Sequence, residues 1–373
     1  MNGLNKISNF NNTCLLVANH IARRVGCDVQ RRIDALKIGQ KMQDLPEELW
    51  HDSFKFYMKD DPNRQGGPNL RMIRLDPHKP SLTVTGYIFN KFVHPYENRF
   101  ITVREAARLQ GFPDSLKFEG TLTSTQLQVG NAVPVSLAKA VFEHLVNQAK
   151  SLSFANRSLK AFSLFSGAGG LDIGAHLTGN IETRVTLDIW SDTCATLRGF
   201  FREGVCVLEQ DIYKVEDPLN LWQNLTDIER PDLVFGGPPC QAFSQAGKQK
   251  ATLDDRGGMI DEFLRFVKHL QPPFFVMENV SNLKGVAGGK LYQEILEKMD
   301  NLGYNVSVGL LLAADFGTPQ LRRRLFFLGC RKEIGSISLP SPTHSLEIEI
   351  FGLLPYVTVS EAFANLPAAE FSR

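Results

Sequence analysis

The second half of the chain alternates short apolar runs with segments whose apolar residues recur every three or four positions. The helical spacing occupies residues 261–270 and 290–303. Strands that alternate with helices in this way build a mostly parallel sheet with helices on both faces. We therefore predict an α/β fold with a doubly wound, mostly parallel sheet. The predicted strands are KAFSLFS, RVTLDI, PDLVFGG, PFFVMENV, YNVSVGLLLA and RRLFFLG, which begin at residues 160, 184, 231, 273, 304 and 323.

The first part of the chain has a less regular pattern. LTVTGYIF at 82–89 predicts a strand because β-branched and aromatic residues dominate it. Residues 102–112 predict a short helix. Thr102 can cap it, Glu105 occupies the capping-box position, and Gly111 can end it.

Residues 135–150 follow a proline and predict an amphipathic helix. The polar stretch 151–160 is typical of a linker. Turn-forming residues dominate both the first 80 positions and the tail after residue 336. We expect these two regions to be rich in loops.

The composition changes this picture little. The chain has 373 residues, 43% hydrophobic and 22% charged, which is ordinary for a globular protein. No apolar run approaches the length of a membrane span, and the N-terminus lacks the form of a signal peptide, so we expect a cytoplasmic protein without a membrane partner. Six scattered cysteines without CxxC pairs argue against a zinc site or a disulfide framework, and no metal is expected.

The charges are unevenly distributed. Residues 1–110 contain 17 Lys and Arg against 11 Asp and Glu, whereas the remainder contains 24 against 29. A basic first part fits a polyanionic partner. A solvated surface explains the same excess equally well.

Glycines follow the first strand of the second half, in LFSGAGGLDIG. Gly167, Gly169 and Gly170 would let the backbone approach a ligand closely. Asp172 stands where a dinucleotide-binding motif would have its third glycine, and it adds negative charge there. This favours a nucleoside that carries an ammonium or sulfonium group over a dinucleotide. A tight turn that simply needs glycine remains an alternative.

Two acidic residues end the next strand-like runs. Asp188 lies roughly twenty residues beyond the glycines, as suits a ribose diol. Asp211 could accept a hydrogen bond from an adenine amino group, with Ile189, Trp190 or Ile212 packed against the ring. Each acid taken singly is equally explained as a helix cap.

A Pro-Pro-Cys sequence follows the strand PDLVF. Two prolines stiffen the backbone and present Cys240, which favours a nucleophile over a structural thiol. Glu278 ends the next strand, where burial should raise its pKa and suit it to proton delivery. Arg322 and Arg324 should face one side of a strand and Arg323 the other. Surface charge would explain the arginines in isolation.

Together these blocks resemble the C5-cytosine DNA methyltransferases. The resemblance covers about residues 70–345, and Asp188 stands where the family usually has glutamate. The glycine-rich block opens most members and VGNAVP closes them, whereas here VGNAVP comes first. The resemblance thus indicates a circular permutant, and joining Arg373 to Met1 would restore the usual order. The matching blocks are FSLFSGAGGLDIG, PDLVFGGPPCQAFSQAGK, DDRGG, FFVMENV, QLRRRLFFLG, ENRFITVREAARLQGFPD and LQVGNAVPVSLA.

The resemblance implies the Rossmann-like fold of S-adenosylmethionine-dependent methyltransferases with a small, loop-rich target-recognition domain. The implied divisions are a target-recognition region at 1–80 with the tail 338–373, a permuted C-terminal part of the catalytic domain at 81–150, a linker at 151–160, and the catalytic core at 161–337.

The resemblance also assigns chemistry to four residues. Cys240 would attack C6 of a cytosine flipped out of the duplex, and Glu278 would hydrogen-bond the ring N3 and the exocyclic amine. Arg322 and Arg324 would hold the site, one of them near the base O2. The residues implied to bind S-adenosylmethionine are Phe165, Gly167, Gly169, Gly170, Asp188, Asp211, Ile212, Pro238, Asn131 and Val133. The loop Gln241–Gly258 would close over DNA, with Gln241, Ser244 and Arg256 contacting it.

The function predicted in this way is sequence-specific DNA cytosine-5 methylation, as the modification enzyme of a restriction-modification system. We expect a monomer that binds double-stranded DNA and shares its site with a cognate restriction endonuclease. A tRNA cytosine-5 methyltransferase and a non-catalytic DNA-binding relative remain alternatives. A nicotinamide oxidoreductase would leave the Pro-Pro-Cys sequence unexplained.

Overall fold

A seven-stranded sheet forms the centre of the protein. The computed structural model describes residues 17–59, 72–86, 91–154, 157–239, 253–347 and 352–372. The strand order is β10-β12-β9-β8-β5-β6-β7, in which β12 is antiparallel to both neighbours and the other pairs are parallel. The predicted doubly wound, mostly parallel sheet is confirmed. Its strands are β5 (Leu159–Leu164), β6 (Ile181–Asp188), β7 (Cys206–Glu209), β8 (Leu233–Gly236), β9 (Phe274–Val280), β10 (Tyr304–Leu312) and β12 (Arg323–Arg331).

The central strands are buried on both faces, which explains their continuous apolar runs. Along β9, Phe274 and Val276 pack into the core on one face, and Phe275 and Met277 pack into the core on the other. Successive side chains of a strand point to opposite faces, so a strand covered on both sides needs apolar residues throughout. All the apolar runs predicted as strands in the second half belong to this sheet.

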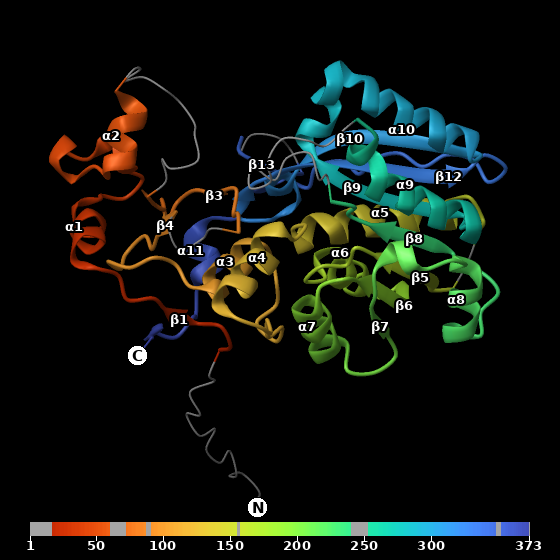
Figure 1. The fold of residues 1–373 in the computed structure, drawn as a ribbon, viewed down its shortest axis with the longest axis horizontal. Coiled ribbons are helices and arrows are strands. Elements are labelled where there is room, and N and C mark those ends of the chain that lie inside the picture. Colours follow the sequence, from red (N-terminus) through yellow and green to blue (C-terminus); the bar gives the residue numbers. More distant parts are fainter. Residues whose placement is uncertain are drawn as a thin grey trace, which may run out of the picture.

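Helices cover both faces of the sheet (Figure 1). The core on one face contains residues of α5 and α6, and the core on the other contains residues of α8, α9 and α10. The helices predicted at 135–150, 261–270 and 290–303 are confirmed, although α9 begins well before residue 261. The bounds are α5 (Val135–Ser151), α6 (Gly170–His176), α7 (Ser191–Phe201), α8 (Pro218–Thr226), α9 (Leu253–Leu270) and α10 (Lys290–Asn301).

The first part of the chain forms a loop-rich body beside the sheet, with its own apolar core. The helix start predicted at Thr102 is confirmed. Thr102 Oγ1 accepts from the Glu105 N–H (3.1 Å), and Glu105 Oε2 accepts from the Thr102 N–H (2.7 Å). Its elements are β1 (Ile21–Ala22), α1 (Cys27–Ala35), η1 (Met42–Asp44), η2 (Glu47–Leu49), α2 (Asp52–Met58), β2 (Ile73–Arg74), β3 (Ser81–Leu82), β4 (Phe92–Val93), α3 (Val103–Leu109) and α4 (Leu122–Asn131).

The strand predicted at 82–89 is wrong at residues 83–86. Among the described residues of this segment, only Leu82 belongs to a strand, β3, which pairs with the two-residue strand β11 (Gln320–Leu321). Beyond it, the Val84 N–H donates to the side-chain Oε1 of Gln320 (2.8 Å), so a side chain takes the place of a neighbouring strand. Residues 87–90 lie outside the described part of the chain.

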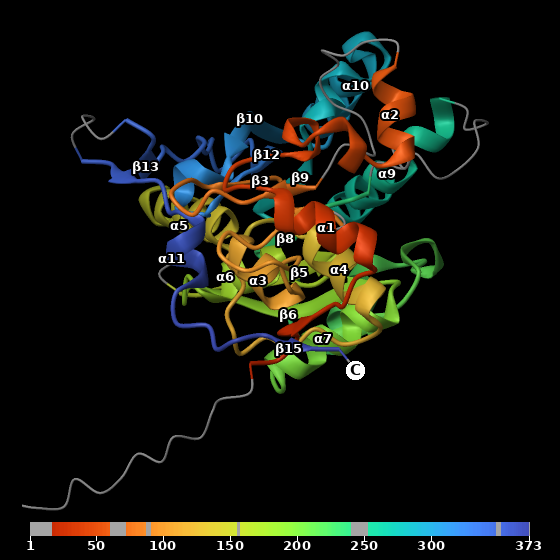
Figure 2. The ribbon, with the colours of Figure 1, turned by 90° about the vertical axis from the view of Figure 1, so that its left-hand side faces the viewer.

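The tail after the sheet returns to this first body. The two ends of the described chain lie side by side as the parallel pair β1 and β15 (Glu370–Phe371), and the Ser372 N–H donates to the Ala22 carbonyl (2.9 Å) (Figure 2). The helix α11 (Val359–Phe363) packs on α3. The remaining elements are η4 (Ile212–Lys214), η6 (Ser281–Gly289), η7 (Ala313–Phe316), β13 (His344–Ser345) and β14 (Leu354–Pro355).

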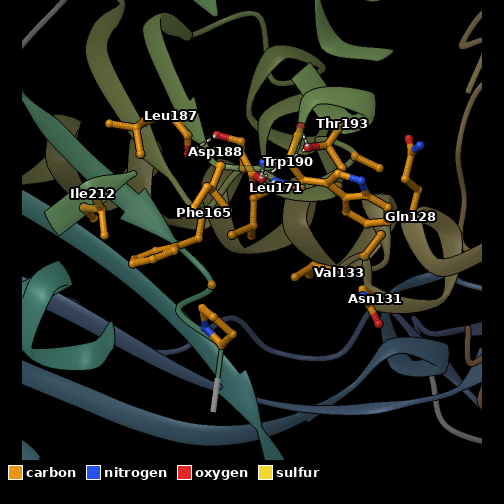
Figure 3. A pocket seen from close by; sticks show the side chains of 18 of the residues that line it. Gln128, Asn131, Val133, Phe165, Leu171, Leu187, Asp188, Trp190, Thr193 and Ile212 are labelled. Atoms are coloured by element: carbon orange, nitrogen blue, oxygen red, sulfur yellow. Dashed lines mark hydrogen bonds between the residues drawn. The ribbon is translucent and has the colours of Figure 1, made fainter. Parts of the chain in front are cut away.

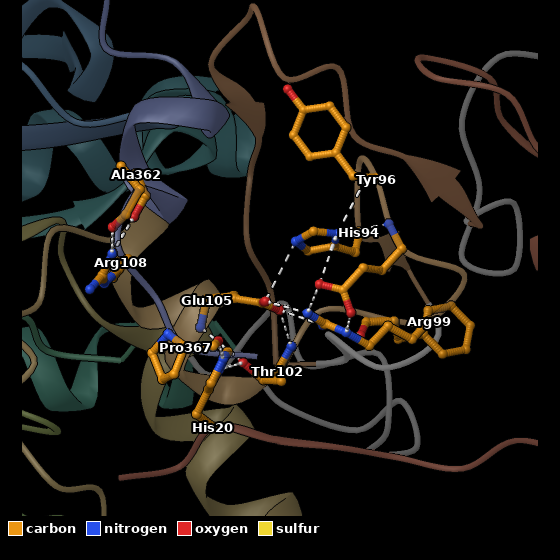
Figure 4. Close-up of polar contacts among 12 residues, drawn as sticks. His20, His94, Tyr96, Arg99, Thr102, Glu105, Arg108, Ala362 and Pro367 are labelled. Carbon is orange, nitrogen blue, oxygen red and sulfur yellow. Dashed lines mark hydrogen bonds and ion pairs between the residues drawn. The ribbon is translucent and has the colours of Figure 1, made fainter. Parts of the chain in front are cut away.

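Polar side chains hold the tail against α3 (Figure 4). His20 lies between Thr102 Oγ1 and the Pro367 carbonyl, at 2.9 Å from each. Arg108 donates to the carbonyls of Ala362 (3.1 Å) and Ala364 (2.6 Å). The segment around His20 and the described part of the tail are therefore packed together against α3. No helix among the described residues is long and apolar enough to cross a membrane.

Candidate cofactor and catalytic site

A cavity of about 290 Å³ opens at the carboxyl ends of β5, β6, β7 and β8 (Figure 3). Loops that follow parallel strands form the usual ligand site of such a sheet. Both parts of the chain line the cavity, because Gln128, Asn131 and Val133 of the first part face residues of the sheet loops. The predicted cofactor residues that line it are Phe165, Gly167, Gly170, Asp188, Asp211, Ile212, Asn131 and Val133.

The glycine-rich turn after β5 needs glycine for two reasons. Phe165, Gly167 and Gly169 have φ of +52°, +52° and +82°, in the left-handed region that favours glycine. A side chain at Gly170 would overlap the carbonyl of Val133, so the absence of Cβ lets the first part of the chain approach. Phe165 adopts this costly conformation without being glycine, and its ring lines the cavity. Gly169 caps α6 and does not line the cavity.

The two predicted acids line the cavity, and Asp211 also caps η4. Asp188 Oδ2 accepts from the Gly167 N–H (2.8 Å), and its Oδ1 accepts from the Trp190 N–H (2.9 Å) and the Thr193 hydroxyl (3.2 Å). Asp211 Oδ1 accepts from the N–H of Tyr213 (3.1 Å) at the start of η4. Capping and ligand binding are compatible here, because each carboxylate oxygen has two lone pairs.

Apolar side chains line the cavity at two ends. Phe165 and Ile212 lie at one end, and Trp190 lies at the other end close to Gln128 (Figure 3). Ile189 also lines the cavity, and 69% of it is exposed. A flat ring can therefore be held between apolar side chains with polar groups at its edges.

Asp172 does not face this cavity, contrary to the expectation that its charge would meet the ligand. It is fully buried in α6, and neither carboxylate oxygen has a hydrogen-bond partner among the described residues. Burial raises the pKa of Asp172 to about 7; the Ser163 hydroxyl and the backbone oppose this shift, and the charge of Asp188 adds to it. Sequence spacing could not foresee which way this side chain points.

A buried ion pair lies at the edge of the same cavity. Glu278 on β9 lines the cavity, and Arg324 Nε lies 2.7 Å from its Oε1. Burial raises the pKa of Glu278, while the positive charges of Arg324 and Arg322 oppose that rise. A Cβ at Gly237 would come within 2.9 Å of Glu278 Oε2, so the glycine lets this carboxylate approach the Pro-Pro-Cys turn.

The Pro-Pro-Cys turn begins at this carboxylate. Pro238 does not line the cavity, but its neighbours Gly237 and Pro239 do. The Pro238 carbonyl instead accepts from Asn279 Nδ2 (3.0 Å), which ties the turn to β9. Cys240, Gln241 and Ser244 lie outside the described residues, and Arg256 belongs to α9 although its side chain is not described.

Arg322 joins the two parts of the chain instead of presenting a free guanidinium to the cavity. Its Nη1 donates to the Val84 carbonyl (2.6 Å) and its Nη2 to the Gly130 carbonyl (3.0 Å). Burial holds the pKa of Arg322 well below its usual value. The arginine therefore holds the first part of the chain against the sheet.

Sequence reasoning missed several amide side chains at this site. Gln128 and Asn279 are described above, and Gln320 Nε2 donates to Gln110 Oε1 (2.8 Å) across the junction. All of them lie in or beside the matching blocks, but nothing in the sequence distinguishes a buried glutamine from a surface one. Among the described residues, no group of His, Cys, Asp and Glu is placed to hold a metal ion.

Comparison with known proteins identifies the family. The family model of C-5 cytosine-specific DNA methylases matches residues 23–147 and 159–361, and the chain belongs to this family. The fold and the cavity agree with that class of protein.

Individual relatives match over part of their length. The chain is 42% identical over 212 residues to the Type II methyltransferase M1.HphI of Haemophilus parahaemolyticus, which covers 56% of this chain and 53% of that protein. It is 40% identical over 226 residues to the Type II methyltransferase M.AquIA of Picosynechococcus sp., covering 56% of this chain and 90% of the relative. A solved structure of a putative prophage-encoded DNA modification methyltransferase from E. coli is 27% identical with a TM-score of 0.45, over 56% of each chain. The chain thus spans about half the length of M1.HphI.

Proposed function

We propose that the protein methylates C5 of cytosine in specific sequences of double-stranded DNA, with S-adenosylmethionine as methyl donor. The observation that carries this proposal is the buried Glu278–Arg324 pair, which lies beside the cavity and against the turn that leads to Cys240. A carboxyl group with a raised pKa at that position is suited to protonating a ring nitrogen while a nucleophile attacks the same ring.

The residues of the cavity fit S-adenosylmethionine. The proposed contacts pack adenine against Phe165 and Ile212, with Asp211 accepting from its amino group and Asp188 accepting from the ribose hydroxyls. The carboxylates would repel a pyrophosphate but attract a ligand that carries positive charge. When bound, S-adenosylmethionine supplies an electrophilic methyl group.

The proposed reaction uses three side chains of this chain. The Cys240 thiolate forms a bond to C6 of the cytosine, and Glu278 donates its proton to the ring N3, which makes C5 nucleophilic. Arg324 Nε lies 2.7 Å from Glu278 Oε1 and holds the carboxyl group in place, as a hydrogen-bond donor when Glu278 is protonated and as an ion pair when it is ionised. After C5 accepts the methyl group, the C5 proton passes to solvent, the N3 proton returns to Glu278, and cleavage of the S–C6 bond releases the base and restores the Cys240 thiolate.

The substrate would have to leave the duplex, because C5 and C6 of a stacked base cannot be reached from both faces. We propose that the segment containing Gln241 and Ser244, together with Arg256 in the first part of α9, contacts the DNA. As the modification enzyme of a restriction-modification system, the protein would act in the cytoplasm as a monomer, on the same site as a cognate endonuclease.

We also propose that the order of the blocks is a circular permutation. The divisions are the target-recognition region at 1–80 with 338–373, the permuted part at 81–150, the linker and the catalytic core at 161–337. The pairing of β1 with β15 supports this proposal, as does the contribution of Asn131 and Val133 to a cavity formed mainly by the sheet loops. A reordered chain that runs from 157 to 373 and then from 1 to 154 should bind cofactor as the natural one does. A reordered chain that loses this binding would contradict the permutation.

The experiment that tests the activity is covalent trapping. The protein is incubated with S-adenosylmethionine and duplex DNA carrying 5-fluorocytosine in many sequence contexts, next to a tRNA arm and a Cys240→Ser control. We expect a denaturation-resistant adduct with DNA that the control lacks, and sequencing of the trapped DNA would give the target. An adduct with tRNA alone, or none despite cofactor binding, would refute the proposal.

A further inference from the structure

A buried carboxyl group without a hydrogen-bond partner among the described residues directly follows two residues of the cavity in the sequence. Asp172 is fully buried, and neither of its oxygens has a hydrogen-bond partner among the described residues. It directly follows Gly170 and Leu171, both of which line the cavity. An ionised carboxylate in such a place is costly unless a positive charge compensates it. The proposed mechanism makes no use of this group.

Ser163 acts on Asp172 and contacts a serine of the cavity. The Ser163 hydroxyl lowers the pKa of Asp172, and Ser163 Oγ lies 3.0 Å from Ser166 Oγ. Ser166 lines the cavity.

Among the described residues, no basic side chain compensates the charge of Asp172. Burial raises its pKa to about 7, and the only neighbouring charge that acts on it is the negative charge of Asp188, which raises the pKa further. The charged groups on the neighbouring elements pair with one another: Lys139 pairs with Glu143 on α5, and Arg184 pairs with Glu182 on β6. His176, on the same helix as Asp172, does not act on its pKa.

We propose that binding of the cationic methyl donor expels the proton of Asp172, and that the resulting carboxylate makes the cavity favour the charged donor over its neutral product. The O–H bond of the carboxyl group breaks and the proton passes to solvent, with no covalent change in the donor. A positive charge in the cavity stabilises the ionised carboxylate through the protein interior, where charges interact strongly. By thermodynamic linkage, the ionised carboxylate tightens donor binding to the same extent.

This inference rests on the proposed cofactor. It gives a physical reason why the protein would bind S-adenosylmethionine more tightly than its product S-adenosylhomocysteine, which lacks the sulfonium charge. Asp172 acts here through charge at a distance, so it is a positioning and discriminating residue and not a catalytic one.

The test is isothermal titration calorimetry of S-adenosylmethionine and S-adenosylhomocysteine at several pH values. The two compounds share the amino acid and adenosine parts and differ in the charge at sulfur, so the ratio of their dissociation constants, compared between the natural protein and Asp172→Asn at each pH, isolates the effect of Asp172. From pH 5.5 to 8.5 we expect this ratio to rise about tenfold in favour of the donor. In Asp172→Asn the ratio should not change with pH.

Proton release is measured in the same experiment with two buffers that differ in ionisation enthalpy. Donor binding near pH 6.5 should release about half a proton from the natural protein, and markedly less in Asp172→Asn. Thr186→Val is the matched control, because Thr186 pairs in register with Ser163 and also has an unpartnered buried hydroxyl. It should keep both the pH dependence and the proton release.

The possible results separate this inference from the proposed function. Donor binding with a ratio independent of pH and with equal proton release in both proteins would overturn the role of Asp172 alone. Absence of binding by either compound at every pH would contradict the proposed cofactor. If Asp172→Asn does not fold, Ser163→Ala replaces it. Loss of that hydroxyl should shift the pH midpoint of the ratio upward, and an unchanged midpoint would refute the inference.

Discussion

The burial of Asp172 also predicts how the stability of the protein depends on pH when no ligand is bound. Asp172 ionises at a pKa of about 7 in the folded protein, against an ordinary value of 3.8. The folded protein therefore retains a proton that the unfolded chain has already lost. Stability must fall by about 1.4 kcal/mol per pH unit as the pH rises from about 4 to 7, and the loss is complete above pH 7.

The magnitude follows from the size of the shift. Raising the pKa from 3.8 to about 7 costs about 4 kcal/mol at pH 8 but only about 2 kcal/mol at pH 5. Asp172→Asn removes the charge while keeping the shape. The free energy of unfolding of the variant, minus that of the natural protein, should therefore be about 2–3 kcal/mol larger at pH 8 than at pH 5.

Guanidinium denaturation of both proteins between pH 5 and pH 8, without cofactor, measures this difference. Asp232→Asn is a useful contrast. Asp232 is paired with Arg157 at 2.6 Å, so its loss should lower stability across this range instead of raising it. Parallel stability profiles for the natural protein and Asp172→Asn would refute the reasoning, because an ionised group in solvent would behave in that way.

Three further predictions concern the site and its support. Arg322→Met removes two buried charge-assisted hydrogen bonds, including that to the Val84 carbonyl, and should lower the free energy of unfolding by about 2–4 kcal/mol in chemical denaturation; an unchanged midpoint would argue against its joining role. Glu278→Gln should keep cofactor affinity in calorimetry but slow adduct trapping at least about 100-fold, and trapping at the natural rate would exclude proton donation by this residue. Phe165→Ala should weaken cofactor binding about tenfold through lost ring contact, with equal affinity counting against stacking there.

Much of the fold and part of the site could be predicted from local patterns. The run PFFVMENV predicts a strand buried on both faces, and β9 is such a strand. Thr102 and Glu105 predict a helix start because capping depends only on residues three positions apart. The positions of Glu278 and Asp188 at strand ends predict that they lie at one edge of the sheet, and both line the same cavity. These features depend on residues close together in the sequence or on a general rule of sheet topology.

Tertiary structure decided what depends on contacts between distant segments. Val84 bonds to a glutamine far along the chain instead of extending a strand. Arg322 donates hydrogen bonds to two backbone carbonyls of the first part of the chain. Asp172 is turned into the interior, although its spacing from the glycines suggests a ligand-facing group. Sequence determines periodicity, capping and the strand ends because these follow from backbone geometry. The direction of a side chain, its burial and hence its pKa are set by the packing of segments far apart in the sequence, which no local pattern contains.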